Sequence, residues 1–222
     1  MKATTNTTFF SLVEHEMICH FPYAVLSVAL SMIAAGILGY FSFGAAPEAV
    51  EHGSMVLFHS CHFLHIVFAA TGAVLTFFRY SKDVLKGLIV GAISAIVFCV
   101  LSDVLLPYVV GELMGINMKL HICFFSELSN VLPFLVVGVF NGWLLSKHHA
   151  GQQSFFSIWS HFAHIFVSSL ASMLYTISHG MHDWYEYMGI LFMLLIIAVV
   201  IACTLSDVVV PAYFAGMGKK QK

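Results

Sequence analysis

The hydrophobic positions of this chain fall into six long stretches separated by short polar connections. The stretches lie near residues 18–43, 55–78, 84–110, 120–145, 155–178 and 187–214. About 20 apolar residues in a helix are enough to cross the roughly 30 Å of hydrocarbon in a bilayer, and each stretch reaches that length. The pattern therefore predicts an all-α polytopic membrane protein with six transmembrane helices.

The composition supports this prediction and leaves no room for a soluble domain. Of the 222 residues, 60% are hydrophobic and 9% are charged, whereas roughly 25% of the residues of an ordinary soluble domain are charged. The first stretch is too long for a cleavable signal peptide, so we expect the chain to keep its N-terminus. Because the connections are short, we expect one membrane domain, 1–222, with its function among the helices.

The basic residues are distributed unevenly between the two sides of the predicted spans. Eight of the nine Lys and Arg residues fall on the side that carries both termini, and only Lys119 falls on the other. Cytoplasmic loops are enriched in Lys and Arg, so we expect both termini in the cytoplasm, as in a multi-pass protein of a bacterial inner membrane. The net charge of -2 gives no indication of nucleic acid binding. The sequence is compatible with either a monomer or a homo-oligomer.

Two polar motifs occur once in each half of the chain, in the same order. SCHFLHI at 60–66 is matched by SHFAHI at 160–165, and LSDVLLP at 101–107 is matched by LSDVVVP at 205–211. The first motif lies in the second predicted helix of its half, and the second motif lies at the end of the third. This order indicates an internal repeat rather than two chance matches.

The first predicted helix of each half adds a weaker match. Glu16 and Glu127 each stand six residues before a proline. Three helices per unit is an odd number, so the second unit must enter the membrane in the opposite orientation to the first. The sequence therefore predicts two inverted three-helix repeats, about 10–112 and 118–216, a plan that is common among secondary transporters.

The repeated residues are of the types that bind transition metals. Histidines three residues apart lie on one face of a helix, so each His-x-x-His pair can direct two nitrogen atoms at one centre. An Asp or Glu at membrane depth costs about 2.5 to 3.5 kcal/mol on insertion scales, and such residues are functional by default. Two imidazoles and two carboxylates form a shell that suits zinc, iron(II), manganese or cobalt.

Other residues alter this picture little. Copper is less favoured as the ion, although Met17, Cys19 and His20 form a soft cluster. The cysteines show no spacing typical of disulfides, and we expect them to be small buried hydrophobic residues. They are Cys19, Cys61, Cys99, Cys123 and Cys203.

Depth along the predicted helices, at about 1.5 Å of rise per residue, divides the expected metal ligands into two layers. The outer layer holds His62, His65, Asp103 and Glu127. The inner layer holds His161, His164, Asp207 and His20, with Glu16 nearer the cytoplasmic surface. The layers are separated by roughly 6 to 20 Å, a range too wide to distinguish one dinuclear site from two separate sites.

Several functions are compatible with this set of residues. The first is a transporter or channel for a divalent transition-metal ion, whose partners are the ion and the lipid bilayer. The second is a membrane metalloenzyme in which both layers form one dinuclear centre, either an oxidoreductase or a hydrolase. A b-type haem electron carrier and a proton channel rank lower, because haem has no use for the matched carboxylates.

Overall fold

The computed structural model describes residues 9–148 and 153–216, and within these ranges the chain is helical with short connections. The α-helices are α1 (Phe9–Phe41), α2 (Pro47–Tyr80), α3 (Val84–Val100), α4 (Leu106–Leu113), α5 (Cys123–Ser126), α6 (Leu128–His148), α7 (Gln153–Ser178), α8 (Met188–Thr204) and α9 (Val210–Phe214). The π-helical turns η1 (Leu101–Leu105) and η3 (Leu205–Val209) join α3 to α4 and α8 to α9, and the 3-10 turn η2 (Trp184–Tyr187) precedes α8. The all-helical prediction is confirmed.

Five helical segments of the described residues are long and apolar enough to cross a membrane. They are Phe10–Phe41, Pro47–Tyr80, Val84–Leu113, Leu128–Lys147 and Trp184–Phe214. This architecture is consistent with a helical membrane protein. The helix α7 covers the remaining predicted stretch but is not among the five, so six crossings stay a prediction. Of the lysines behind the topology prediction, Lys2, Lys219, Lys220 and Lys222 lie outside the described residues.

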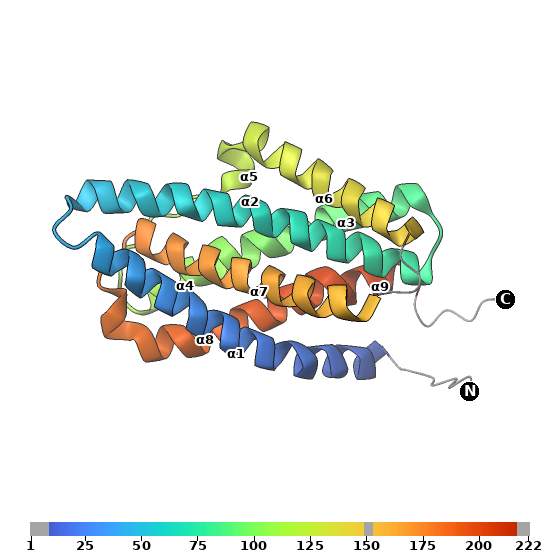
Figure 1. Ribbon diagram of the computed structural model, residues 1–222, viewed down its shortest axis with the longest axis horizontal. Helices are drawn as coiled ribbons and strands as arrows, with labels where there is room; N and C mark the ends of the chain where they lie inside the picture. The colour runs from blue at the N-terminus through green and yellow to red at the C-terminus, as the bar shows by residue number, and fades with distance from the viewer. Residues whose placement is uncertain (1–8, 149–152, 217–222) are drawn as a thin grey trace.

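The long helices lie side by side, and successive ones run in opposite directions along the longest axis of the molecule (Figure 1). α2 packs against α3, α6 and α7, and α1 packs against α7 and α8. α7 is therefore enclosed by its neighbours. From Ile165 onward most of its residues are buried, including many serines. This helix is the polar centre of the bundle.

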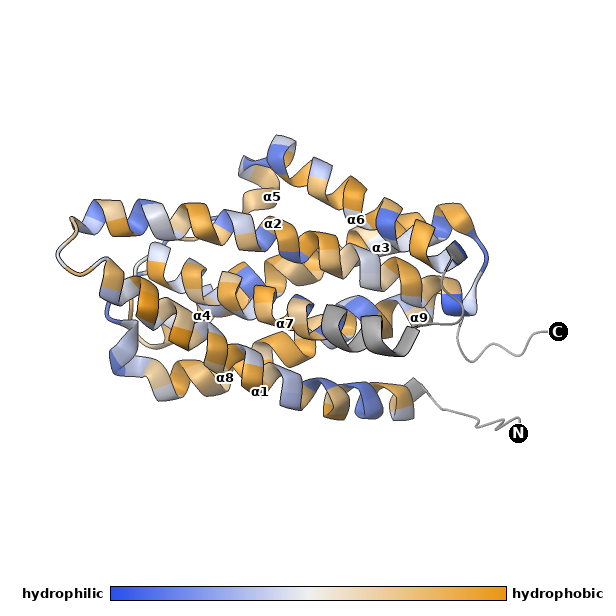
Figure 2. Cartoon of the chain, in the orientation of Figure 1, coloured by the Kyte–Doolittle hydropathy of each residue, from blue (hydrophilic) through white to orange (hydrophobic). Residues whose placement is uncertain are grey.

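The bundle exposes large apolar side chains and buries polar ones beside its hydrophobic core. Ile33, Ile93 and Met193 are more than half exposed, whereas Ser102, Ser168 and other hydroxyl side chains are completely buried. Figure 2 shows hydrophobic residues along the outer helices of the bundle. An extensive apolar surface is favourable in lipid and unfavourable in water.

Glycines allow α6 to approach α2 closely. A Cβ atom on Gly138 would lie 2.7 Å from the carbonyl oxygen of Val67, and one on Gly142 would lie 2.8 Å from that of Thr71. The two glycines are four residues apart, a spacing that lets helix backbones meet in membranes. The Thr71 hydroxyl donates a hydrogen bond to the Gly138 carbonyl over 3.0 Å.

The two π-helical turns have the same cause in the sequence. Proline has no backbone N–H, so Pro107 cannot donate to the carbonyl of Asp103 four residues earlier, and Pro211 cannot donate to that of Asp207. The N–H of the residue before each proline instead reaches back five residues, to Leu101 and Leu205 respectively. Both aspartates thus lie in wide π turns, which often occur at functional sites.

The helix predicted over 120–145 differs from the one observed. The short helix α5 ends at Ser126, Glu127 has a non-helical conformation with φ -129° and ψ 36°, and α6 begins at Leu128. Glu127 therefore lies at the end of the membrane-length helix and not within it. Apolar residues continue across this break, so hydrophobic composition alone does not reveal it.

Candidate metal centre

The first half of the chain places two histidines on one carboxylate. His62 Nδ1 lies 2.9 Å from Asp103 Oδ2, and His65 Nδ1 lies 2.7 Å from the same oxygen. The other oxygen of Asp103 accepts hydrogen bonds from the hydroxyls of Ser102 at 2.6 Å and Ser168 at 3.0 Å. A carboxylate can only accept, so the imidazoles are the donors. All of these side chains are buried.

The second half repeats this contact once. His164 Nδ1 lies 2.8 Å from Asp207 Oδ2, and both side chains are buried. The other oxygen of Asp207 is buried and has no hydrogen-bond partner within the described residues. Gly72 on α2 leaves the space for this carboxylate, because a Cβ atom there would lie 3.0 Å from Asp207 Oδ2.

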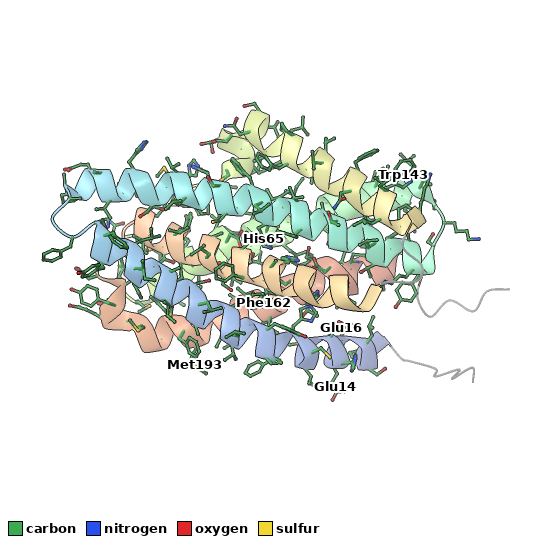
Figure 3. The ribbon with its side chains drawn as sticks, viewed as in Figure 1. Glu14, Glu16, His65, Trp143, Phe162 and Met193 are labelled. Carbon is green, nitrogen blue, oxygen red and sulfur yellow. The ribbon has the colours of Figure 1, made fainter. Side chains whose placement is uncertain are left out.

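The two halves meet at His65 and His164. Their Nε2 atoms are 2.8 Å apart, and the Cys203 sulfur completes a buried group whose ligand atoms all lie within 4.8 Å of one another. Figure 3 labels His65 in the interior of the bundle, beside α7, while Met193 and Glu14 lie at the periphery. The layers that the sequence placed roughly 6 to 20 Å apart are therefore in contact.

The hydrogen bonds at Nδ1 determine what the facing Nε2 atoms can do. A neutral imidazole carries one proton, so a ring that donates from Nδ1 has a lone pair on Nε2. His65 and His164 would then direct two lone pairs at each other across 2.8 Å. That contact is repulsive unless a proton or a metal ion lies between the nitrogen atoms. Two ligand nitrogens on one tetrahedral zinc ion are about 3.3 Å apart, so a small shift would admit an ion.

The remaining histidine of the second half faces the first helix. His161 Nε2 contacts His20 Nε2 at hydrogen-bonding distance. The other ring nitrogen of His20 contacts Glu16: its Nδ1 lies 2.5 Å from the Glu16 carbonyl oxygen and 3.9 Å from the Glu16 carboxylate. Glu16 is therefore placed to orient His20, and its predicted role as a metal ligand stays a prediction.

Glu127 contacts a histidine one turn away from its expected partners on α2. Its Oε1 lies 3.6 Å from His59 Nε2, and its Oε2 accepts a hydrogen bond from Asn130 over 2.9 Å. The break before α6 places Glu127 at the end of the membrane-length helix. Its expected grouping with His62 and His65 stays a prediction.

Sequence reasoning overlooked the cysteines of the centre, although a signal was present. Cys99 and Cys203 each stand four residues before the aspartate of the repeated motif, so the match extends to CVLSDVLLP and CTLSDVVVP. Residues four apart lie on one helical face. The Cys203 thiol is within hydrogen-bonding range of both His65 and His164, and the Cys99 thiol is within range of His65.

Two groups beyond the membrane-length helices have strongly altered acidity. Burial lowers the pKa of His179 to about 4, against the opposing effect of its hydrogen bond to the Tyr175 carbonyl. Burial also raises the pKa of the Cys123 thiol to about 12, and the charge of Glu127 adds to this effect. At neutral pH and without a bound metal ion, the His179 imidazole is therefore uncharged and the Cys123 thiol is protonated.

Comparisons with protein-family models, with curated proteins and with solved structures found no match. The chemistry of the site is nevertheless specific. Two imidazole nitrogens and one thiol sulfur in apolar surroundings form a set that suits zinc and cobalt(II), and the sulfur makes manganese a poorer match than the sequence had implied.

Proposed function

We propose that this protein binds a divalent transition-metal ion of the zinc type between His65, His164 and Cys203 and carries it across the membrane. The observation behind this proposal is the pair of Nε2 atoms, one from each half of the chain, that face each other at 2.8 Å while both Nδ1 atoms are hydrogen-bonded to aspartates. Histidine ligands of metals are typically held in this way.

The charges of the centre favour a cation at this position. Asp103 and Asp207 bring two negative charges into the interior, and within the described residues histidines are the partners in all of their ion pairs. Uncompensated buried charge is costly in an apolar surrounding. Cysteine binds a metal as the thiolate, so a divalent ion bound to Cys203, with Asp103 and Asp207 ionised, leaves a net charge of -1. A single shared proton cancels one of the two carboxylate charges.

The geometry suggests different roles for the predicted ligands. We assign His65, His164 and Cys203 to the ion, and we assign Asp103 and Asp207 to holding the imidazoles in the required tautomer. His62 Nε2 is buried and has no hydrogen-bond partner among the described residues, and so offers a neighbouring position to which an ion can pass. The His20–His161 pair offers another. Several weak positions in succession allow an ion to leave a site that binds it well.

The proposed architecture is six spans arranged as two inverted three-helix repeats, with both termini in the cytoplasm. Its support is the pair of π turns with matching CxLSD sequences, which bring one aspartate and one nearby cysteine from each half to a common centre. Transporters with inverted repeats bind their substrate at the repeat interface near the membrane midplane. The His65–His164 contact occupies such an interface.

A metalloenzyme is the second candidate, and the contact between the two layers favours it. Two metal ions about 3.5 to 4 Å apart can act together on one substrate, and a second ion beside His62 or His161 would make such a centre. A proton channel without a metal ion would use the chain of hydrogen bonds from Asp103 through His65 and His164 to Asp207.

Metal binding and ion flux by the purified protein test the proposal. We expect wild-type protein in proteoliposomes to move Zn²⁺ or Co²⁺, and we expect His65→Ala to abolish both tight binding at the centre and flux, because it removes one of three ligands. His52→Ala is the matched control, since His52 lies exposed on the same helix. Tight binding without flux would favour the enzyme. Proton flux without metal binding would favour the proton channel, and either result would overturn the transport proposal.

A further inference from the structure

A second group of candidate ligand atoms lies apart from the metal centre. His59, His121 and Cys123 present nitrogen and sulfur atoms that all lie within 4.8 Å of one another, with Cys123 buried and both histidines partly buried. His59 comes from α2, about one turn before His62, while His121 and Cys123 lie in and just after the connection between α4 and α5. We call this group the outer site, because it lies on the side predicted to face away from the cytoplasm.

Contacts with α7 fix the segment that carries His121 and Cys123. The Tyr175 hydroxyl accepts a hydrogen bond from the His121 backbone N–H over 3.2 Å and donates one to the Lys119 carbonyl over 3.1 Å. The His121 ring also stacks on that of His179, with centroids 5.9 Å apart and an interplanar angle of 26°. The outer site is therefore held by the bundle and is not a chance arrangement of loop side chains.

Each histidine of the outer site has one nitrogen atom available for an ion. In the part of the chain that the structure describes, His59 Nε2 is buried without a hydrogen-bond partner. The ring is hydrogen-bonded to the backbone at Met55, which leaves a lone pair on Nε2. His121 Nε2 lies 3.2 Å from Ser126 Oγ, and the single Ser126 proton can go to this nitrogen or to the Ile122 carbonyl. With that proton on the carbonyl, the ring donates from Nε2 and keeps its lone pair on Nδ1.

The charge of the outer site matches a divalent ion. The Glu127 carboxylate lies 3.6 Å from His59 Nε2, and a Cys123 thiolate would supply the second negative charge. We propose that His59, His121 and Cys123, with Glu127 as the fourth group, form a separate site for a zinc-type divalent ion. Two imidazoles, one thiolate and one carboxylate are a typical tetrahedral donor set for such an ion.

The outer site is connected to the centre by the spacing of histidines on α2. His59, His62 and His65 recur every three residues and so follow one face of the helix. His62 lies between His59 and His65 on α2, and its buried Nε2 has no hydrogen-bond partner within residues 9–148 and 153–216. The outer site is thus placed to bind an ion before it passes to the central site, or after it leaves that site. This transfer role rests on the proposed function, whereas ion binding at the outer site does not.

Titration of the full-length protein with Co²⁺ tests the outer site, because cobalt bound to a thiolate gives a near-ultraviolet charge-transfer band. We expect wild-type protein to bind two Co²⁺ ions per chain, and we expect both Cys123→Ser and His121→Ala to retain only the central one. Cys203→Ser should retain only the outer ion. Cys61→Ser is the control, since Cys61 lies on α2 beside His62 but in neither group, and it should bind both ions.

The outcomes separate this proposal from the proposed function. Two ions retained by folded Cys123→Ser and His121→Ala proteins would overturn the outer site. Loss of flux in His65→Ala with the outer ion still bound would support both proposals. Absence of flux in wild-type protein, together with loss of one ion in Cys123→Ser, would overturn transport and leave the outer site established.

Discussion

At the scale of single residues, the chemistry of the centre depends on what holds the far side of each imidazole. Asp103 orients His62 and His65, Asp207 orients His164, and the Glu16 carbonyl orients His20. An imidazole with a fixed Nδ1 hydrogen bond presents a lone pair in a fixed direction, whereas a free imidazole exchanges tautomers. The carboxylates therefore act on the ion through the histidines.

The contact of Gly72 with Asp207 gives a residue-scale prediction. We expect Gly72→Ala to weaken Co²⁺ binding at the centre by about 10- to 100-fold, the range typical of changes behind a metal ligand. The added methyl would lie 3.0 Å from the Asp207 oxygen that receives the His164 proton, and so would displace the orienting carboxylate. Competition with a chelator of known affinity measures the change.

Gly53→Ala is the matched control for this prediction, because Gly53 lies on the same helix with open space around its Cβ position. It should leave metal binding unchanged and stabilise α2 by up to about 1 kcal/mol, the usual gain for this exchange in a helix. Equal effects of the two substitutions on Co²⁺ affinity would show that Asp207 has no orienting role.

At the scale of elements, the two π turns direct the Asp103 and Asp207 side chains differently from a regular α-helix. An extra residue in a turn rotates the following segment and redirects the side chains beside it. Asp103 and Asp207 lie in these turns, and both reach histidines on neighbouring helices. The prolines that cause the turns are thus part of the site although they touch no ion.

Replacing these prolines tests that idea. We expect Pro107→Ala to weaken central metal binding by about tenfold or more, as expected for a displaced orienting group, while the fold is kept. Alanine supplies the N–H that the Asp103 carbonyl lacks, so the turn can close as a regular α-helix. Co²⁺ affinity and the thermal midpoint of unfolding in detergent are the measurements.

The control for the proline exchange is Pro133→Ala, because Pro133 also lies inside a membrane-length helix, α6, but away from the aspartates. It should regularise α6 and leave Co²⁺ affinity unchanged. If Pro107→Ala binds Co²⁺ as tightly as wild type, then the π turn is incidental to the site.

At the scale of the whole molecule, the arrangement of polar and apolar residues is consistent with a helical membrane protein. Exposed aliphatic side chains surround a centre of histidines, aspartates and serines, and the halves contribute matching residues to that centre. An ion at the His65–His164 contact would be shared between the halves. A relative movement of the halves would then alter its coordination, which is the usual basis of alternating access.

Labelling with a membrane-impermeant maleimide tests the topology. In a Cys19→Ser background, which removes the exposed native cysteine, we expect intact cells to label Phe43→Cys between α1 and α2 but not Ser81→Cys between α2 and α3. Inside-out vesicles should show the reverse, because the basic residues indicate a cytoplasmic α2–α3 connection. Labelling of both positions from one side would show that α2 does not cross the membrane.

The sequence by itself determined the features that depend on neighbours along the chain. The helical class follows from runs of apolar residues, and the shared face of His62 and His65 follows from helical period. Pro107 and Pro211 remove the N–H groups that would bond to the Asp103 and Asp207 carbonyls. The extent of the helices was less certain, since apolar composition continues through the break at Glu127. Each of these features is set within a few turns of chain.

Only the tertiary structure decided which of these residues meet. His65 and His164 are far apart in sequence, and their depths along separate helices do not fix the distance between them. Helix tilt and packing, including the close approach of α6 to α2 at Gly138, decide such distances. The same packing assigned Glu127 to His59 and brought Cys203 to the histidines, because side-chain contacts between helices depend on shape complementarity that no local pattern encodes.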